Sequence, residues 1–144
     1  MNKANLEHVN ITVKDPELTA EMLCKLFDWE VRWSGPSQFG GFTVHVGTES
    51  DYLALYCPER SKALRPFSKQ QAGRECGGLN HIAVTVDDLI ETERRVRDAG
   101  MKPLNHATYE PGARFYFFDH DGIEYEVVSY SRTMGLSEFA SVFK

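Results

Sequence analysis

Alternating apolar and polar residues mark the first strand of the chain, at residues 6–13. Apolar side chains occupy every second position, at Val9, Ile11 and Val13. The polar residues between them are His8, Asn10 and Thr12. A period of two with β-branched residues is typical of a strand with one buried face. The other face of this strand is therefore expected to carry a row of polar side chains.

A change to helical periodicity follows at residues 16–28. Leu18, Met22 and Leu26 lie four residues apart and define one apolar stripe. Asp15 is suited to cap this helix, and Pro16 to occupy its first turn. Three further strands are predicted after the helix, within 29–33, 39–47 and 52–56, separated by turns at 34–36 and 48–51. The first part of the chain, about residues 5–57, thus has the order β-α-β-β-β.

The chain then repeats itself. Residues 79–88 match residues 6–15 position by position, with no insertion or deletion. Leucine, histidine, threonine, valine and aspartate are identical in both segments. The same element order follows: a strand at 79–86, a helix capped by Asp87 or Asp88 and closed by Gly100, and strands at 101–106, 114–118 and 123–129. Turns are expected at 110–112 and 119–122. We predict an α+β fold, with two βαβββ modules in tandem forming a curved mixed sheet around a central cavity.

The remaining segments are assigned by composition. Residues 58–78 mix basic residues with proline and glycine and are expected to be an exposed linker whose charges face solvent. The second module covers about 79–130. A tail at 131–144 has weak helical character over 133–143. All 144 residues are expected to form one domain.

Charge and cysteine usage narrow the possible partners. The net charge is −5 and no basic cluster occurs, which argues against nucleic acid. Three cysteines without a CxxC pair indicate reduced thiols, as in a cytoplasmic protein. No apolar run is long enough to span a bilayer, so no membrane partner is expected.

The two polar rows point to a candidate metal site. His8 and His81 occupy the same repeat position on the polar faces of the two first strands. Glu126 lies in the last strand and shares a face with Glu124 and Val128. One strand histidine is more often structural than ligating, but its duplication favours a ligand role. Two imidazoles and one carboxylate form a set that suits Fe, Mn or Zn.

The βαβββ duplication, the two histidine strands and the segment FFDHDGIEYE at 117–126 resemble the vicinal oxygen chelate superfamily. This group includes glyoxalase I, methylmalonyl-CoA epimerase, extradiol dioxygenases, fosfomycin-resistance proteins and bleomycin-binding proteins. Its members usually place a ligand glutamate four residues after the glycine of a DPDG-type turn, which corresponds to Glu126. The resemblance implies metal ligands at His8, His81 and Glu126. Ala54 falls at a fourth ligand position, so the four-ligand glyoxalase I and epimerase are matched less well.

The three-ligand members differ from this chain in other positions. Relative to fosfomycin transferases, Asn10 replaces a threonine and Arg114 a serine, whereas Tyr116 matches a substrate-contacting tyrosine. Extradiol dioxygenases add an acid–base histidine and a tyrosine beside the iron. The candidates for those roles are His45, His106, Tyr116 and Tyr125.

The resemblance implies a divalent-metal-dependent enzyme of the glyoxalase/dioxygenase type, a lyase, isomerase or dioxygenase acting on a small oxygenated substrate. Glu126 would be both ligand and proton shuttle, and the metal Fe, Mn, Zn or Ni. The expected substrate-binding residues are Asn10, Tyr56, Arg114 and Tyr116. A homodimer is expected. The alternative is a non-catalytic small-molecule or antibiotic-binding resistance protein of the bleomycin-binding type.

Overall fold

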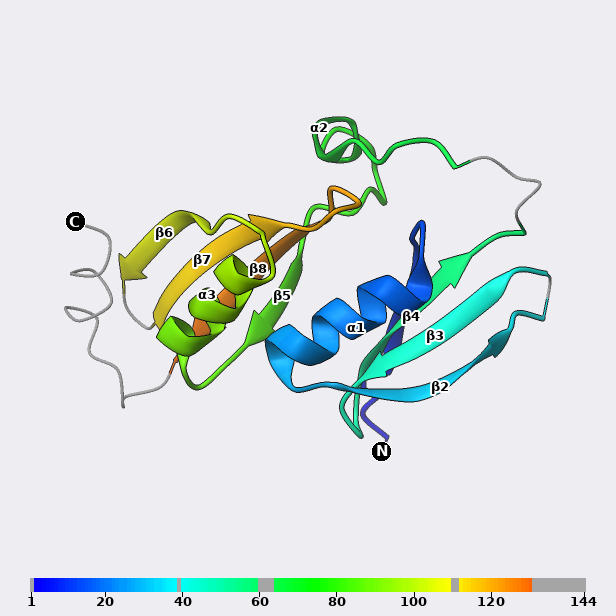
Figure 1. Cartoon of the computed structure of the whole chain (residues 1–144), viewed down its shortest axis with the longest axis horizontal. Coiled ribbons are helices and arrows are strands. Elements are labelled where there is room, and N and C mark those ends of the chain that lie inside the picture. The colour runs from blue at the N-terminus through cyan, green and yellow to red at the C-terminus, as the bar shows by residue number, and fades with distance from the viewer. Residues whose placement is uncertain (1, 39, 60–63, 110–111, 131–144) are drawn as a thin grey trace. The chain divides into compact units, whose positions relative to one another are not determined.

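The computed structural model describes residues 2–38, 40–59, 64–109 and 112–130. These residues fall into two compact units, Met1–Arg65 and Pro66–Lys144. Each unit contains one four-stranded mixed sheet with a helix across one of its faces (Figure 1). The predicted α+β class and the two tandem βαβββ modules are confirmed.

The first unit follows the predicted element order. It consists of β1 (His8–Thr12), α1 (Pro16–Phe27), β2 (Glu30–Pro36), β3 (Phe42–Gly47) and β4 (Tyr52–Cys57). The strand order is β1-β4-β3-β2, with β1 parallel to β4 and the other pairs antiparallel. The first and last strands of the module therefore lie side by side, which brings residues from both onto one sheet face.

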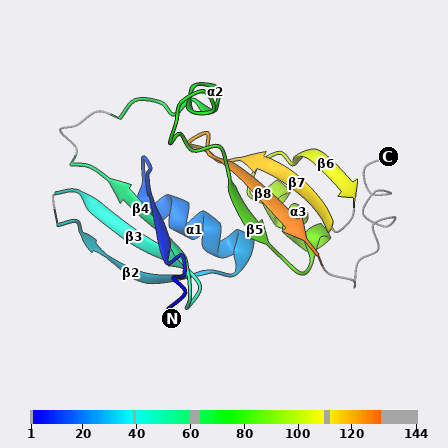
Figure 2. The same ribbon diagram turned by 180° about the vertical axis from the view of Figure 1, so that it is seen from behind.

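The second unit repeats this arrangement after a short helix. Its elements are α2 (Lys69–Ala72), β5 (Ile82–Thr85), α3 (Leu89–Asp98), β6 (Leu104–Tyr109), β7 (Gly112–Phe118) and β8 (Glu124–Ser129). The order β5-β8-β7-β6 corresponds strand for strand to that of the first unit. From behind, these strands lie in front of α3, so the helix-free face of the sheet is visible (Figure 2).

Each core lies between a helix and its sheet. In the first unit, Leu23 and Leu26 of α1 are fully buried, as are Val46 and Leu55 of the sheet. In the second unit, Leu89 and Val96 of α3 and a set of large sheet side chains are buried: Phe115, Phe117, Tyr125 and Val127. The opposite face of each sheet is left for polar side chains, as the alternation predicts. Among the described residues, no helix combines the length and apolar character needed to cross a bilayer.

The helix caps repeat along with the strands. Asp15 Oδ1 accepts a hydrogen bond from the amide of Leu18 at 3.1 Å, and Pro16 opens the helix. Asp88 Oδ1 accepts from the amide of Glu91 at 3.0 Å. Asp88, rather than Asp87, is therefore the cap of the second module, and it occupies the repeat position of Asp15.

Several boundaries differ from prediction. Residues 34–36 continue β2, because Gly35 and Pro36 pair with Thr43 and Phe42. β2 is an edge strand, where proline's missing N–H is tolerated. Val9 is 41% exposed because α1 packs mainly on β3 and β4 and leaves the edge strand β1 partly uncovered.

The segment predicted to be a linker contains α2, capped by the Ser68 hydroxyl. Two predicted features lie partly or wholly outside the described residues: the turn at 110–112, of which Glu110 and Pro111 are not described, and the tail helix at 133–143.

The repeated caps yield a stability test. Asp88→Ala removes the side-chain acceptor at the start of α3 and should lower the free energy of unfolding by about 1 kcal/mol. Urea denaturation followed by circular dichroism measures this change. Asp87→Ala is the matched control and should leave stability nearly unchanged. An equal loss in both variants would contradict the assignment of the cap.

Candidate functional site

The candidate site of the second module is built on the sheet face opposite α3. His81 lies directly before β5, and Glu126 is in the adjacent strand β8, paired in register with Ala83 and Tyr116. His81 Nε2 lies 3.0 Å from Glu126 Oε2. The ring of Tyr116 meets that of His81 edge-on, with centroids 5.9 Å apart. The structure thus brings together His81, Tyr116 and Glu126, three of the residues singled out in the sequence.

Arg114 holds the other oxygen of the same carboxylate. Its Nη1 donates to Glu126 Oε1 at 2.7 Å, and the two side chains are only 14% and 10% exposed. Charge-assisted hydrogen bonds of this kind are short and strong. Arg114 therefore fixes the orientation of Glu126 and leaves Oε2 directed at the imidazole.

Asn80 contacts the second nitrogen of the His81 ring. Asn80 Oδ1 lies 2.7 Å from His81 Nδ1 and accepts a hydrogen bond from Lys69 Nζ at 3.2 Å. Because an ammonium group only donates, the Asn80 atom shared by both contacts is the oxygen, and His81 Nδ1 must carry a hydrogen. The lone pair of a neutral ring is then on Nε2, where it faces Glu126 Oε2.

Lys69 is held by a second contact as well. Its Nζ donates to Glu124 Oε1 at 2.7 Å, and the lysine side chain is 25% exposed. Lys69 comes from α2, within the segment predicted to be a solvated linker. For this lysine the prediction is wrong, because a carboxylate on β8 and the amide of Asn80 bind it.

The first module presents an equivalent histidine. His8 opens β1, and its Nδ1 lies 2.8 Å from Glu7 Oε1, which also accepts from the Tyr52 hydroxyl at 3.2 Å. These two hydrogen bonds hold the pKa of Glu7 below its usual value, and the bond from His8 has the larger effect. Asn10 lies two residues after His8 in β1 and therefore shares its face. Tyr56 pairs in register with Thr12, the next residue on that face, so it lies on the same face as well.

Aromatic rings surround His8 on this face. The His8 and Tyr52 rings stack at 4.9 Å, His45 and Tyr52 at 4.7 Å, and Trp33 lies 5.1 Å from His45. The guanidinium of Arg32 sits 4.3 Å above the Tyr52 ring. Burial above all, with smaller electrostatic contributions from His8 and Arg32, lowers the pKa of His45, which favours its neutral form. We call these five residues, Arg32, Trp33, His45, Tyr52 and His8, the aromatic cluster.

Strand register resolves the position of Ala54. Ala54 pairs with Asn10 and with His45, just as Glu126 pairs with Ala83 and with Tyr116. Ala54 is therefore the counterpart of Glu126, and the first module lacks that carboxylate. His45 is the counterpart of Tyr116, a relation that the sequence repeat alone does not reveal.

Two residues considered for catalysis lie elsewhere. His106 Nε2 is 2.8 Å from Oε1 of the buried Glu93 on α3, which places His106 on the helix side of the sheet. The Tyr125 hydroxyl donates to Asp119 at 3.2 Å within the core. Burial raises the pKa of Tyr125 well above its usual value. Neither side chain faces Glu126.

The complete sequence-derived triad remains a prediction. His81 and Glu126 come together in the second unit, whereas His8 belongs to the first. Within the part of the chain that the structure describes, no three His, Cys, Asp or Glu side chains gather as a metal cluster. The residues that sequence reasoning missed are Glu7, Asn80 and Lys69. Glu7 and Asn80 could have been found by their position, since each directly precedes a repeated histidine.

Comparison with known proteins identifies the family. The model of the Glyoxalase/Bleomycin resistance protein/Dioxygenase superfamily matches residues 5–127. No curated protein sequence matches the chain significantly. Among solved structures, a glyoxylase/bleomycin resistance protein/dioxygenase domain from Frankia sp. EAN1pec is 19% identical, with a TM-score of 0.72 over 89% of this chain and 98% of that one.

The fosfomycin resistance protein FosX from Listeria monocytogenes is 18% identical, with a TM-score of 0.63 over 95% of this chain and 98% of its own. A mutant of the Listeria protein, solved with Mn(II) and 1S,2S-dihydroxypropylphosphonic acid, gives 19% identity and a TM-score of 0.64 over 88% of this chain and 92% of that one. At these identities the likeness concerns the fold. Because the family model matches residues 5–127, most of the length of this chain, the chain belongs to the Glyoxalase/Bleomycin resistance protein/Dioxygenase superfamily.

Proposed function

We propose that this protein is a divalent-metal-dependent enzyme in which His8, His81 and Glu126 hold one ion. The substrate class is a small molecule with two neighbouring oxygen atoms, which the ion would bind together. This covers the lyase, isomerase and dioxygenase reactions of the superfamily. The donor set of two imidazole nitrogens and one carboxylate oxygen suits Fe, Mn, Zn or Ni.

The observation that carries the proposal is the contact between His81 and Glu126. Nδ1 of His81 donates to Asn80, and Oε1 of Glu126 accepts from Arg114. The atoms left over, Nε2 and Oε2, lie 3.0 Å apart, and in the neutral form of the ring both are acceptors. Two lone pairs at this distance repel each other unless a proton or a cation binds them both. A divalent cation satisfies both atoms at once.

The bound ion would supply Lewis acidity to the substrate oxygens. The protein's part is to orient and to move protons. Arg114 keeps Glu126 aligned, and a carboxylate released from the ion would be placed to take up a substrate proton. Tyr116 lies beside His81 on the same face, with its ring edge-on to the imidazole, and is proposed to contact substrate. Asn10 and Tyr56 are proposed to bind substrate from the first module.

Metal content tests the proposal. After incubation with Mn, Fe, Zn or Ni and removal of excess, the wild-type protein should retain about one equivalent per chain, measured by mass spectrometry of the metal. His8→Ala, His81→Ala and Glu126→Ala should each lose most of it. His120→Ala, in an exposed turn, is the control and should retain it. A wild-type protein that takes up none of the four metals would contradict the proposal.

A second candidate is binding of a small molecule without chemistry, as in the bleomycin-binding type. The aromatic cluster favours it, because partly exposed rings such as Trp33, which is 47% exposed, can stack on a flat ligand. Thermal unfolding with a cationic glycopeptide, with and without chelator, separates the two functions. A rise in melting temperature that chelator leaves unchanged would support binding without chemistry. A rise that chelator abolishes supports the metal-dependent function.

We also propose a homodimer. β1 is an edge strand of its sheet, and Val9 is exposed on it together with the neighbouring Leu6, which is 77% exposed. Apolar side chains at a free sheet edge are commonly covered by further protein. Sedimentation equilibrium should give twice the mass of one chain. A single-chain mass at micromolar concentration would contradict the proposal.

A further inference from the structure

Both repeated histidines are contacted by the residue that directly precedes them. Glu7 Oε1 lies 2.8 Å from His8 Nδ1, and Asn80 Oδ1 lies 2.7 Å from His81 Nδ1. The two preceding residues differ in type, one charged and one neutral, yet both offer an oxygen to the same ring nitrogen. The contact has thus been kept across the duplication although the residue has not.

Each of these oxygens is itself bound by a second donor. In the second module, Lys69 Nζ donates to Asn80 Oδ1 at 3.2 Å. In the first, the Tyr52 hydroxyl donates to Glu7 Oε1 at 3.2 Å. The two donors come from unrelated places, α2 and β4. Both modules therefore contain a series of hydrogen bonds that runs from a donor through an acceptor oxygen to Nδ1.

This series of hydrogen bonds determines which ring nitrogen carries the hydrogen. A carboxylate only accepts, and so does the Asn80 oxygen, so Nδ1 must be the donor in both rings. Nε2 of a neutral ring is then free to bind a metal. Hydrogen bonds of this type fix the tautomer and orientation of metal-binding imidazoles and increase their basicity.

We propose that Glu7 and Asn80 are positioning residues that hold His8 and His81 with hydrogen on Nδ1 and with Nε2 directed at the ion, and that Tyr52 and Lys69 hold these two residues in turn. This proposal rests on the metal site proposed above. It gives the segment between the modules a role in the site, since α2 supplies Lys69.

Nitrogen-15 NMR of the histidine rings tests the positions of the hydrogens. Spectra of wild-type protein at about pH 8.5, above the ordinary pKa of imidazole, report which ring nitrogen is protonated. His8 and His81 should carry a hydrogen on Nδ1 in the metal-free protein and keep it in the zinc-loaded protein. Hydrogen on Nε2 alone, in either ring, would overturn the proposal for that module.

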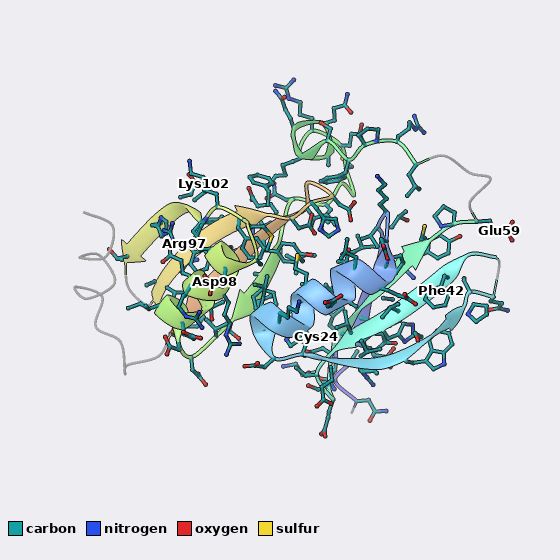
Figure 3. The ribbon with its side chains drawn as sticks, viewed as in Figure 1. Cys24, Phe42, Glu59, Arg97, Asp98 and Lys102 are labelled. Carbon is teal, nitrogen blue, oxygen red and sulfur yellow. The ribbon has the colours of Figure 1, made fainter. Side chains whose placement is uncertain are left out.

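Zinc affinity of matched variants tests the consequence. Asn80→Leu, Lys69→Met and Glu7→Leu should each weaken zinc binding about 10- to 100-fold. Asn80→Asp and Glu7→Gln keep the acceptor oxygen and should restore most of the affinity. The controls are Glu75→Leu and Lys102→Met, both exposed in the second unit, with Lys102 labelled in Figure 3. They should bind as wild type does.

The outcomes separate the two proposals. A wild-type protein that binds no zinc contradicts the metal site, while the metal-free NMR spectra still decide the positioning role. Wild-type zinc binding that is unchanged by Asn80→Leu and Glu7→Leu overturns the positioning role and leaves the metal site standing. Circular dichroism identifies any variant that does not fold. For the residue changed in such a variant, the wild-type NMR spectra test the positioning role instead.

Discussion

The candidate site depends on one electrostatic constraint, the close approach of an imidazole nitrogen and a carboxylate oxygen, which repel each other when the ring is neutral. His81 Nε2 and Glu126 Oε2 lie 3.0 Å apart, and the other polar atoms of both side chains are already engaged by Asn80 and Arg114. An uncompensated pair of this kind would be unstable where the carboxylate is only 10% exposed. A shared proton or a shared cation removes the repulsion. Every proposed role in the second module follows from how these four side chains are held.

The fold creates this constraint through strand register. Because β5 and β8 are neighbours, the residues at the start of the module and at its end face each other across one sheet. The large side chains of β7 and β8 that point toward α3 form the core, which leaves Arg114 and Glu126 on the opposite face. The first module has the same register but places Ala54 where the carboxylate would be. Its face is occupied instead by the aromatic cluster.

Most of the fold could be predicted from the sequence because its signals are local. Alternation located the strands, and Asp15 marked the start of a helix. Features set by distant contacts could not be predicted. Lys69 is 55 residues from the carboxylate it binds, and nothing near it in sequence announces that partner. The side of the sheet that His106 faces was also hidden, because β6 has an irregular register there and Asn105 adopts a positive φ of 52°.

The identity of the atoms around a bound metal tests the central claim most directly. X-ray absorption at the zinc edge of the loaded protein distinguishes nitrogen and oxygen ligands, at about 2.0–2.1 Å, from sulfur ligands at about 2.3 Å. We predict a spectrum with the multiple-scattering signature of two imidazoles and with oxygen in the remaining positions. A spectrum that shows sulfur ligands, or no imidazole, would contradict the account.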